Sequence, residues 1–386
     1  MGTFSLRSER IVLPGRVAAG YLPVRDGALG AWQASRPEGE VVDVGASWVA
    51  PGLVDTHIHG FWGHATTDCD AAGMLAASEE LARRGTTSWL PTTFTESAEA
   101  IGCACEAIAR AAEESEAQGA AWRGARIQGI YLEGPFFTER HVGAQNPAYL
   151  CDPSLRLLRE WQRRARGRIV KSALAPERAG SVGYVAAAVA EGVVACVGHT
   201  DATYDEAVAA VDAGATCFVH TYNAMRGLHH RDPGVVGCAM TTPATFAELI
   251  CDGHHVAPAA AAALVCAKGW DHVVPITDCL GCGGLPEGEY TSGGLPVVMR
   301  DGACYLRDKD ALAGSVATLA ECVRNLAAWG VVTPEQAIRM ATEVAARSAR
   351  VDGRCGLLVP GRPADLVVLS PALELEATYV GGARVA

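Results

Sequence analysis

The chain has 386 residues and a formal net charge of −11 at pH 7, with 32 Lys and Arg against 43 Asp and Glu. This length exceeds that of a usual single domain, but it suits one α/β barrel with a small satellite domain. Hydrophobic residues make up 49% of the chain, which is enough for a large core. The negative charge argues against a nucleic-acid partner, because binding a phosphate backbone needs a basic surface. A small phosphorylated ligand remains compatible, since one or two local cations can hold it.

No apolar run approaches the roughly 20 residues that span a bilayer, so no membrane contact is expected. The stretch from Met1 to Arg10 is polar and charged where a signal peptide would be apolar, which predicts a cytoplasmic protein. The 14 cysteines are scattered along the chain and predict free thiols rather than disulfides. Cys279 and Cys282 form an isolated C-x-x-C, which is a weak signal for zinc or redox chemistry.

The first fifty residues contain short apolar runs separated by Gly and Pro, which predict small strands. These runs cover residues 10–13, 16–19 and 41–44. Residues 360–370 and 377–385 have the same character. We therefore predict a small β-sandwich domain formed by both ends of the chain, residues 1–50 plus 356–386, and a second domain over residues 51–355.

The middle of the chain alternates apolar runs with alanine-rich helical stretches. The predicted strands are 52–55, 88–91, 127–132, 169–174, 193–197, 216–219, 247–250 and 273–277. The predicted helices are 72–84, 98–118, 180–191, 204–213, 257–268 and 316–329, with further helix over 329–350. Eight strands, most of them followed by a helix, predict an α/β fold with a (β/α)8 TIM-type barrel.

Imidazole and carboxylate side chains stand at the ends of five predicted strands. They are His57, His59, Glu133, His199, His220 and Asp278. Because the C-terminal ends of barrel strands converge on one mouth, these residues are expected to meet there. Burying so many polar groups without a common partner would be destabilising. A divalent cation such as Zn, Fe or Mn is the partner that such ligands suit, so we predict one or two ions per chain.

Several motifs resemble those of a known family. Residues 50–60, A-P-G-L-V-D-T-H-I-H-G, resemble the first-strand motif of the amidohydrolase superfamily, whose members are metal-binding (β/α)8 barrels. Residues 131–137, Y-L-E-G-P-F-F, and 220–225, H-T-Y-N-A-M, resemble motifs of the N-acetylglucosamine-6-phosphate deacetylase family within it. Shorter similar stretches are G-H-T-D at 198–201, R-D-P-G at 231–234, D-G-H-H-V at 252–256, T-D at 277–278 and L-A-G-S at 312–315.

This resemblance implies a role for each candidate. Glu133, His199 and His220 would hold the main metal, and His57 and His59 would supply a second site. Asp278 would be the catalytic general base and acid, and His255 would hydrogen-bond the acetyl carbonyl. The implied substrate contacts are Ala144, Gln145, Asn223, Ala224, Arg231, His255, Leu312 and Gly314.

The phosphate needs a fixed cation, and Arg231 is the candidate because a guanidinium can bind it in bidentate fashion. The resemblance also implies a homodimer in which the partner subunit completes the phosphate site. Lys171 is a possible bridging ligand of the kind found in other branches of the superfamily. We interpret it instead as a structural residue at its strand end.

The expected reaction is metal-dependent hydrolysis of N-acetyl-D-glucosamine 6-phosphate to D-glucosamine 6-phosphate and acetate, in amino-sugar catabolism and recycling. Two departures from the family pattern leave the sugar epimer open. Gln145 stands where many relatives have a histidine, and C-L-G-C-G-G at 279–284 replaces an alanine-rich loop. The alternatives are N-acetylgalactosamine 6-phosphate or another N-acyl amine, and, more distantly, an inactive scaffold that binds a sugar phosphate.

Overall fold

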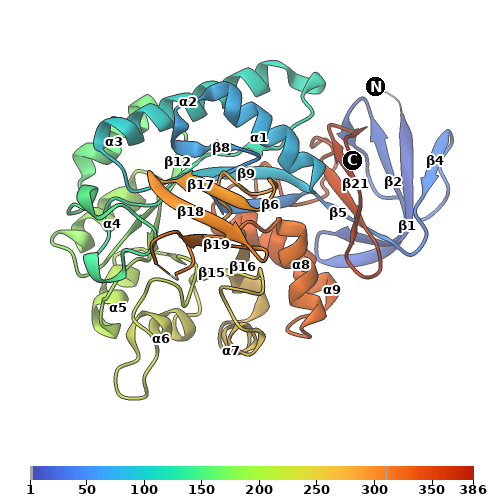
Figure 1. Ribbon diagram of the computed structural model, residues 1–386. Helices are drawn as coiled ribbons and strands as arrows, with labels where there is room; N and C mark the ends of the chain where they lie inside the picture. The colour runs from blue at the N-terminus through green and yellow to red at the C-terminus, as the bar shows by residue number, and fades with distance from the viewer. Residues whose placement is uncertain (1–2, 310) are drawn as a thin grey trace.

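Eight parallel strands form the centre of the molecule in the computed structural model, which describes residues 3–309 and 311–386. They are β6 (Leu53–Ile58), β9 (Thr86–Thr93), β11 (Ile130–Leu132), β12 (Ile169–Leu174), β13 (Val194–Val197), β14 (Cys217–Phe218), β15 (Phe246–Ile250) and β16 (Val273–Ile276). A short additional strand, β10 (Arg126–Ile127), also pairs with β9. Each strand pairs in parallel with the next, from β6 through β9 and β11 to β16. Helices surround these strands (Figure 1).

The barrel closes between its first and last strands at the point where both strands end. The backbone N–H of Asp278 donates to the carbonyl of His57 at 2.9 Å, and that of His59 donates to the carbonyl of Cys279 at 2.8 Å. Thr277 reinforces the junction, because its hydroxyl donates to the buried carboxylate of Asp55 at 2.6 Å. Burial raises the pKa of Asp55 to about 6, although the hydrogen bond from Thr277 opposes this shift. Closure of the barrel therefore brings candidate ligands from β6 and β16 together.

Most predicted helices are present with ends shifted by a few residues. They are α1 (Ala71–Arg83), α2 (Ala98–Ala117), α4 (Ser181–Ala190), α5 (Tyr204–Asp212), α7 (Pro258–Lys268) and α8 (Leu319–Ala328). The predicted helix over 329–350 is divided into α9 (Pro334–Arg339), a π-helical segment (Met340–Val344) and α10 (Ala345–Ser348). Thr333 caps α9, and Pro334 occupies its first turn. Two helices were not predicted, α3 (Leu155–Arg164) and α6 (Gly234–Thr241).

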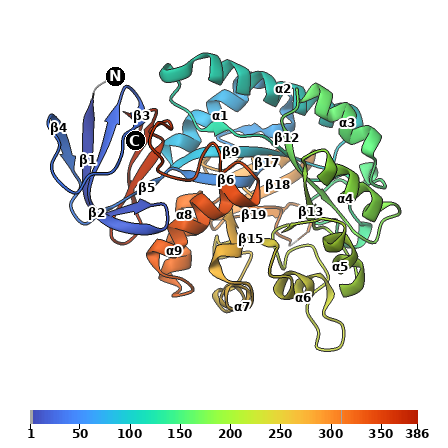
Figure 2. The same ribbon diagram turned by 180° about the vertical axis from the view of Figure 1, so that it is seen from behind.

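Both ends of the chain form a separate sheet beside the barrel (Figure 2). Its strands are β1 (Phe4–Leu13), β2 (Arg16–Arg25), β3 (Ala28–Leu29), β4 (Glu40–Asp43), β5 (Trp48–Pro51), β20 (Leu366–Leu369), β21 (Leu375–Val380) and β22 (Ala383–Arg384). Here β5 pairs with β1 on one side and with β20 on the other. The predicted fold class, a barrel with a small β-domain made from both ends, is confirmed. The domain boundaries at residues 50 and 356 stay a prediction, and residues 1 and 2 of that domain lie outside the described part.

A single glycine joins the N-terminal part of the small domain to the barrel. Gly52 follows β5 directly and precedes β6, the strand that carries His57. A Cβ atom at this position would lie 1.9 Å from the hydroxyl oxygen of Thr87 on β9. Only glycine therefore allows the chain to pass so close to the neighbouring strand.

A three-stranded antiparallel sheet between β16 and α8 was also not predicted. It consists of β17 (Gly288–Ser292), β18 (Leu295–Arg300) and β19 (Ala303–Leu306), and it lies in front of the barrel strands in Figure 1. The backbone N–H of Ala313 donates to the carbonyl of Cys304 on β19 at 2.9 Å, which attaches the 312–315 segment to this sheet. The 14 cysteines are free thiols, as predicted, and the pair Cys279 and Cys282 is buried. Across the described residues, no helix has the length and apolarity that a membrane crossing requires.

Candidate metal centre and active site

Six side chains meet at the mouth of the barrel in two groups of three. One group is Glu133, His199 and His220, and the other is His57, His59 and Asp278. Within each group the potential ligand atoms lie within 4.8 Å of one another, and the side chains are buried. These are the six residues that follow the predicted strands, so the structure brings them together as expected from a barrel.

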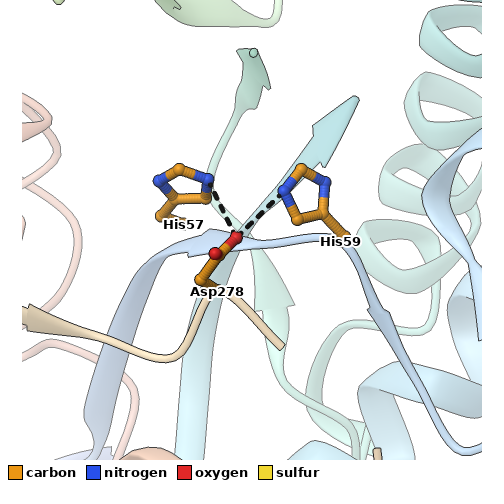
Figure 3. A group of neighbouring side chains, drawn as sticks. All are labelled: His57, His59 and Asp278. Carbon is orange, nitrogen blue, oxygen red and sulfur yellow. Dashed lines mark ion pairs between the residues drawn. The ribbon is translucent and has the colours of Figure 1, made fainter. Parts of the chain in front are cut away.

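Glu133 lies between the two groups and contacts both of them. Its Oε1 atom is 3.2 Å from Nε2 of His199 and 3.1 Å from Nε2 of His220. The same oxygen is 3.3 Å from Nε2 of His57, and Oε2 is 3.2 Å from Nε2 of His59. Figure 3 shows the second group, in which one oxygen of Asp278 faces both rings, at 3.4 Å from His57 and 3.1 Å from His59.

Three of the four imidazoles have their orientation fixed by backbone carbonyls. Nδ1 of His59, His199 and His220 each faces one carbonyl oxygen. The carbonyls belong to Thr92 at 3.1 Å, His141 at 2.9 Å and Asn223 at 3.2 Å, respectively. A carbonyl can only accept a hydrogen bond, so the proton of a neutral ring sits on Nδ1 and leaves Nε2 as a bare lone pair. This arrangement is typical of histidines that bind a metal through Nε2.

The geometry of these lone pairs fits a divalent cation. The Nε2 atoms of His199 and His220 lie 3.1 Å apart, so in the neutral rings two lone pairs face each other. Nε2 of His57 is buried and has no hydrogen-bond partner among the described residues, although it lies near two carboxylates. A cation among these atoms would remove both penalties, and nitrogen and carboxylate ligands suit Zn, Fe or Mn.

The charges at the site also favour bound positive charge. Burial alone would raise the pKa of Glu133, but the charges of His57 and His199, together with hydrogen bonds, hold it well below its usual range. The pKa of Asp278 is likewise lowered, because the hydrogen bond from His59 and the charge of His57 outweigh its burial. Two ionised carboxylates therefore share a buried pocket, which requires compensation by protons on the imidazoles or by a metal.

Three residues of the site have an unusual backbone conformation. His199, His220 and Asp278 have φ angles of 47°, 23° and 49°, in the left-handed region that residues other than glycine rarely adopt. Each lies two residues beyond the end of its strand, on β13, β14 and β16 respectively. Such conformations cost about 1–3 kcal/mol each and are concentrated at functional sites.

A cavity of about 380 Å³ opens beside these ligands. Seven of the predicted substrate contacts line it: Ala144, Gln145, Asn223, Ala224, His255, Leu312 and Gly314. The amide of Gln145 is hydrogen-bonded at both ends. Its oxygen accepts from the backbone N–H of Thr95 at 2.6 Å, and its nitrogen donates to Oε2 of Glu133 at 2.5 Å. Gln145 therefore contacts the candidate metal centre directly.

Arg231 does not line this cavity. It is exposed on the loop before α6, with its guanidinium 2.8 Å from the ring of the neighbouring His230. The arginine among the lining residues is Arg140, which is paired with Asp201 at 3.0 Å. Arg140 and the adjacent His141 follow L-E-G-P-F in the stretch T-E-R-H, and the charge of that stretch is the sequence signal that would have identified them.

The sequence interpretation also missed residues that support the ligands. The ring of Phe94 stacks on His59 with centroids 3.8 Å apart, and Phe94 directly follows β9. Glu248 on β15 lies 2.9 Å from Nδ1 of His57. Its partner is Lys171, which lies within β12 rather than at its end. An acidic residue and a lysine inside apolar strands were the signals for this pair.

A (β/α)8 barrel that gathers imidazole and carboxylate ligands at its mouth is the arrangement of a metal-dependent enzyme. The model of the Amidohydrolase family matches residues 48–385, and the chain belongs to this family. The N-acetylglucosamine-6-phosphate deacetylase of Vibrio furnissii is 36% identical over 345 residues, covering 89% of this chain and 84% of that protein. The N-acetylgalactosamine-6-phosphate deacetylase of Escherichia coli is 37% identical over 343 residues, covering 89% of each.

A solved structure extends this similarity to the whole chain. It is a variant of the N-acetyl-D-glucosamine-6-phosphate deacetylase of Mycobacterium smegmatis, in complex with N-acetyl-D-glucosamine-6-phosphate. It is similar to this chain with a TM-score of 0.93 and 29% identity, over 100% of both chains.

Proposed function

We propose that the chain hydrolyses the acetamide of N-acetyl-D-glucosamine 6-phosphate, releasing acetate and D-glucosamine 6-phosphate. The observation that carries this proposal is the pair of bare imidazole nitrogens, His199 and His220, which lie 3.1 Å apart next to Glu133. They stand beside a cavity of about 380 Å³ that Asp278 and His255 also line. The relatives named above act on acetylated amino-sugar phosphates by name, which supports the choice of substrate.

Glu133, His199 and His220 would hold the main metal ion, and His57, His59 and Asp278 a second one. An ion held there would lower the pKa of a bound water toward about 7 and polarise the acetyl carbonyl. The nitrogen and oxygen ligands are compatible with Zn, Fe and Mn. Metal analysis of the purified protein is expected to find at least one divalent ion per chain. A protein that is fully active without metal would contradict this proposal.

Asp278 would act as the general base and then as the general acid. Its Oδ1 atom faces His57 and His59, and the residue lines the cavity. A carboxylate in this position can take the proton of the attacking water and deliver it to the leaving amine. Its lowered pKa keeps it ionised and ready to accept that proton.

His255 would stabilise the charge that develops on the acetyl oxygen. Its Nδ1 atom lies 2.6 Å from the carboxylate of Asp252, which also accepts the backbone N–H of His255 at 2.9 Å. When both ring nitrogens carry protons, Nδ1 donates to Asp252 and Nε2 can donate to an oxygen in the cavity. A fixed donor of this kind stabilises the transition state more than the ground state.

The phosphate would be held by Arg231 of a partner subunit in a homodimer. The support for this is the exposure of Arg231 and its absence from the lining of its own cavity. The alternative is that the phosphate binds within one chain, to Arg140, which lines the cavity. Arg231→Ala is expected to raise KM for the phosphorylated sugar by about 10-fold to 100-fold, while Arg140→Ala has a smaller effect. Equal losses on phosphorylated and unphosphorylated sugars would contradict a phosphate role.

Acetate release is the assay that tests the substrate. We expect the highest kcat/KM with N-acetylglucosamine 6-phosphate, followed by its galacto epimer, with little activity on unphosphorylated N-acetylglucosamine. The galacto epimer is the second candidate, because identity to the Vibrio and Escherichia relatives is nearly the same, at 36% and 37%. A higher kcat/KM with the galacto epimer would decide for that candidate, and no acetate release from any of them would refute the deacetylase function.

A further inference from the structure

A buried charged pair lies behind the candidate metal centre and has no part in the mechanism above. Lys171 on β12 and Glu248 on β15 are both fully buried and form an ion pair. Neither residue lines the cavity. Burying two charges is costly, and such pairs are often replaceable by apolar residues without loss of stability. Stability alone is therefore a weak explanation of this pair.

The second oxygen of Glu248 reaches the metal centre. Oε2 lies 2.9 Å from Nδ1 of His57, and it is also 3.4 Å from the backbone N–H of His220. A carboxylate facing Nδ1 places the ring proton there and leaves Nε2 of His57 bare. That Nε2 atom is the one that points at Glu133 and Asp278, at 3.3 and 3.4 Å.

His57 is the one imidazole of the four whose Nδ1 atom faces a side-chain carboxylate. Their Nδ1 atoms face backbone carbonyls, which can only accept. The side chain of Glu248 is held in place by neighbours on two sides. Lys171 pairs with Oε1, and the Lys171 ammonium lies 4.3 Å from the ring centroid of Tyr131, whose ring packs edge-on against His57 at 4.9 Å.

We propose that Glu248, held by Lys171, is a positioning residue that selects the His57 tautomer able to bind metal, and so controls occupancy of the His57–His59–Asp278 group. This inference rests on the metal-dependent part of the proposed function. It does not depend on which sugar is the substrate. Partners of this kind affect metal affinity by about 10-fold to 100-fold.

The substitution Glu248→Gln tests this positioning role, because Lys171 determines which end of the new amide faces His57. Lys171 can only donate, so it takes the single amide oxygen of the new glutamine. The amide nitrogen then faces Nδ1 of His57 and donates to it. The ring proton moves to Nε2, where it blocks the metal. We expect the second ion to bind on the order of 10-fold to 100-fold more weakly, with the first ion little changed.

The double variant Lys171→Met/Glu248→Gln is the matched control. Without the lysine, the glutamine can turn its oxygen toward His57 and restore the metal-binding tautomer. It is therefore expected to recover most of the affinity for the second ion that Glu248→Gln loses. A merely structural role would not produce this recovery, since the double variant departs further from the native core.

Metal-depleted wild-type protein and metal-depleted variants are titrated with Co²⁺ or Zn²⁺. The dissociation constants of both ions are measured by calorimetry and by the Co²⁺ absorption spectrum.

If Glu248→Gln does not fold, Lys171→Met/Glu248→Leu replaces it as an apolar pair. This variant is expected to fold and to lose affinity for the second ion. The proposal is overturned if the wild-type chain binds a single ion, if the single or the apolar variant binds both ions normally, or if the double variant shows no recovery. None of these readings uses a substrate, so a failed acetate-release assay would reject the proposed function separately.

Discussion

The two halves of the metal centre are built in different ways. In the Glu133–His199–His220 group, backbone carbonyls hold both imidazole rings: that of His141 faces His199 and that of Asn223 faces His220. In the His57–His59–Asp278 group, the ligands come from the first and last barrel strands, and His57 relies on Glu248. In the first half both rings are thus oriented by the backbone, whereas in the second half one ring is oriented by the side chain of Glu248. We expect the first half to keep its metal when the second half has lost its own.

Glu133→Gln should have the largest effect, because Glu133 is shared by the two halves. The amide removes the charge that contacts all four imidazoles. We expect both ions to be lost and turnover to fall by at least about 10⁴-fold. Metal analysis together with acetate release measures this, and a variant that retains one tightly bound ion would show that the halves are independent.

Asp278→Asn should separate chemistry from metal binding. The amide cannot accept the proton of water, so kcat is expected to fall by about 10²-fold to 10⁴-fold. The ion at Glu133, His199 and His220 should remain, because Asp278 is not in that group. Near-normal turnover would remove Asp278 from the mechanism, and loss of every ion would show that the two halves cannot be occupied separately.

Substitution of one histidine in each half tests whether the two halves contribute unequally to turnover. His199→Gln is expected to lower kcat by about 10³-fold, since it removes a ligand of the main ion. His57→Gln should lower it by only about 10-fold, because that half is an addition to the main site. The kcat values of the two variants are to be compared at saturating metal concentration. Equal losses for the two variants would mean that the reaction needs both ions.

Gln145→Ala should have an effect on kcat as small as that of His57→Gln. The amide of Gln145 is committed to Glu133 and Thr95, so its loss disturbs the shared carboxylate rather than the sugar. We expect kcat to fall by about 10-fold with KM nearly unchanged, as for a charge-assisted hydrogen bond. Gln145→Glu, which adds a carboxylate beside Glu133, should be worse than Gln145→Ala. A rise in KM with constant kcat would instead assign Gln145 to the sugar.

The regular parts of this fold were predictable from the sequence because each has a local signal. Strand β12 lies at the predicted residues 169–174, where a stretch that begins with Ile-Val ends at Ala-Pro. Helix α3 was missed because half of its ten residues are charged, and only Leu158 and Trp161 are buried. The β17–β19 sheet was missed because its strands are short, partly exposed and separated by turns.

The candidate site likewise has residues that the sequence could locate and contacts that it could not predict. His57, Glu133 and Asp278 could be located, because chain position relative to a strand end is enough to place a residue at the barrel mouth. The supporting contact between Glu248 and His57 could not, since it joins residues 191 positions apart through side-chain orientation. The placement of Arg231 outside its own cavity also follows from the path of a loop, which residue pattern does not determine.

Gly52 has a consequence for recombining relatives of this protein. The strand that leaves the small domain passes Thr87 at a distance that allows no side chain, and it reaches His57 five residues later. A chimaera with a crossover inside residues 48–59 would join a terminal sheet from one parent to a ligand strand whose packing was shaped by another. Crossovers should therefore keep β5, Gly52 and β6 as one inherited block, together with β9 and β20, which pair with them.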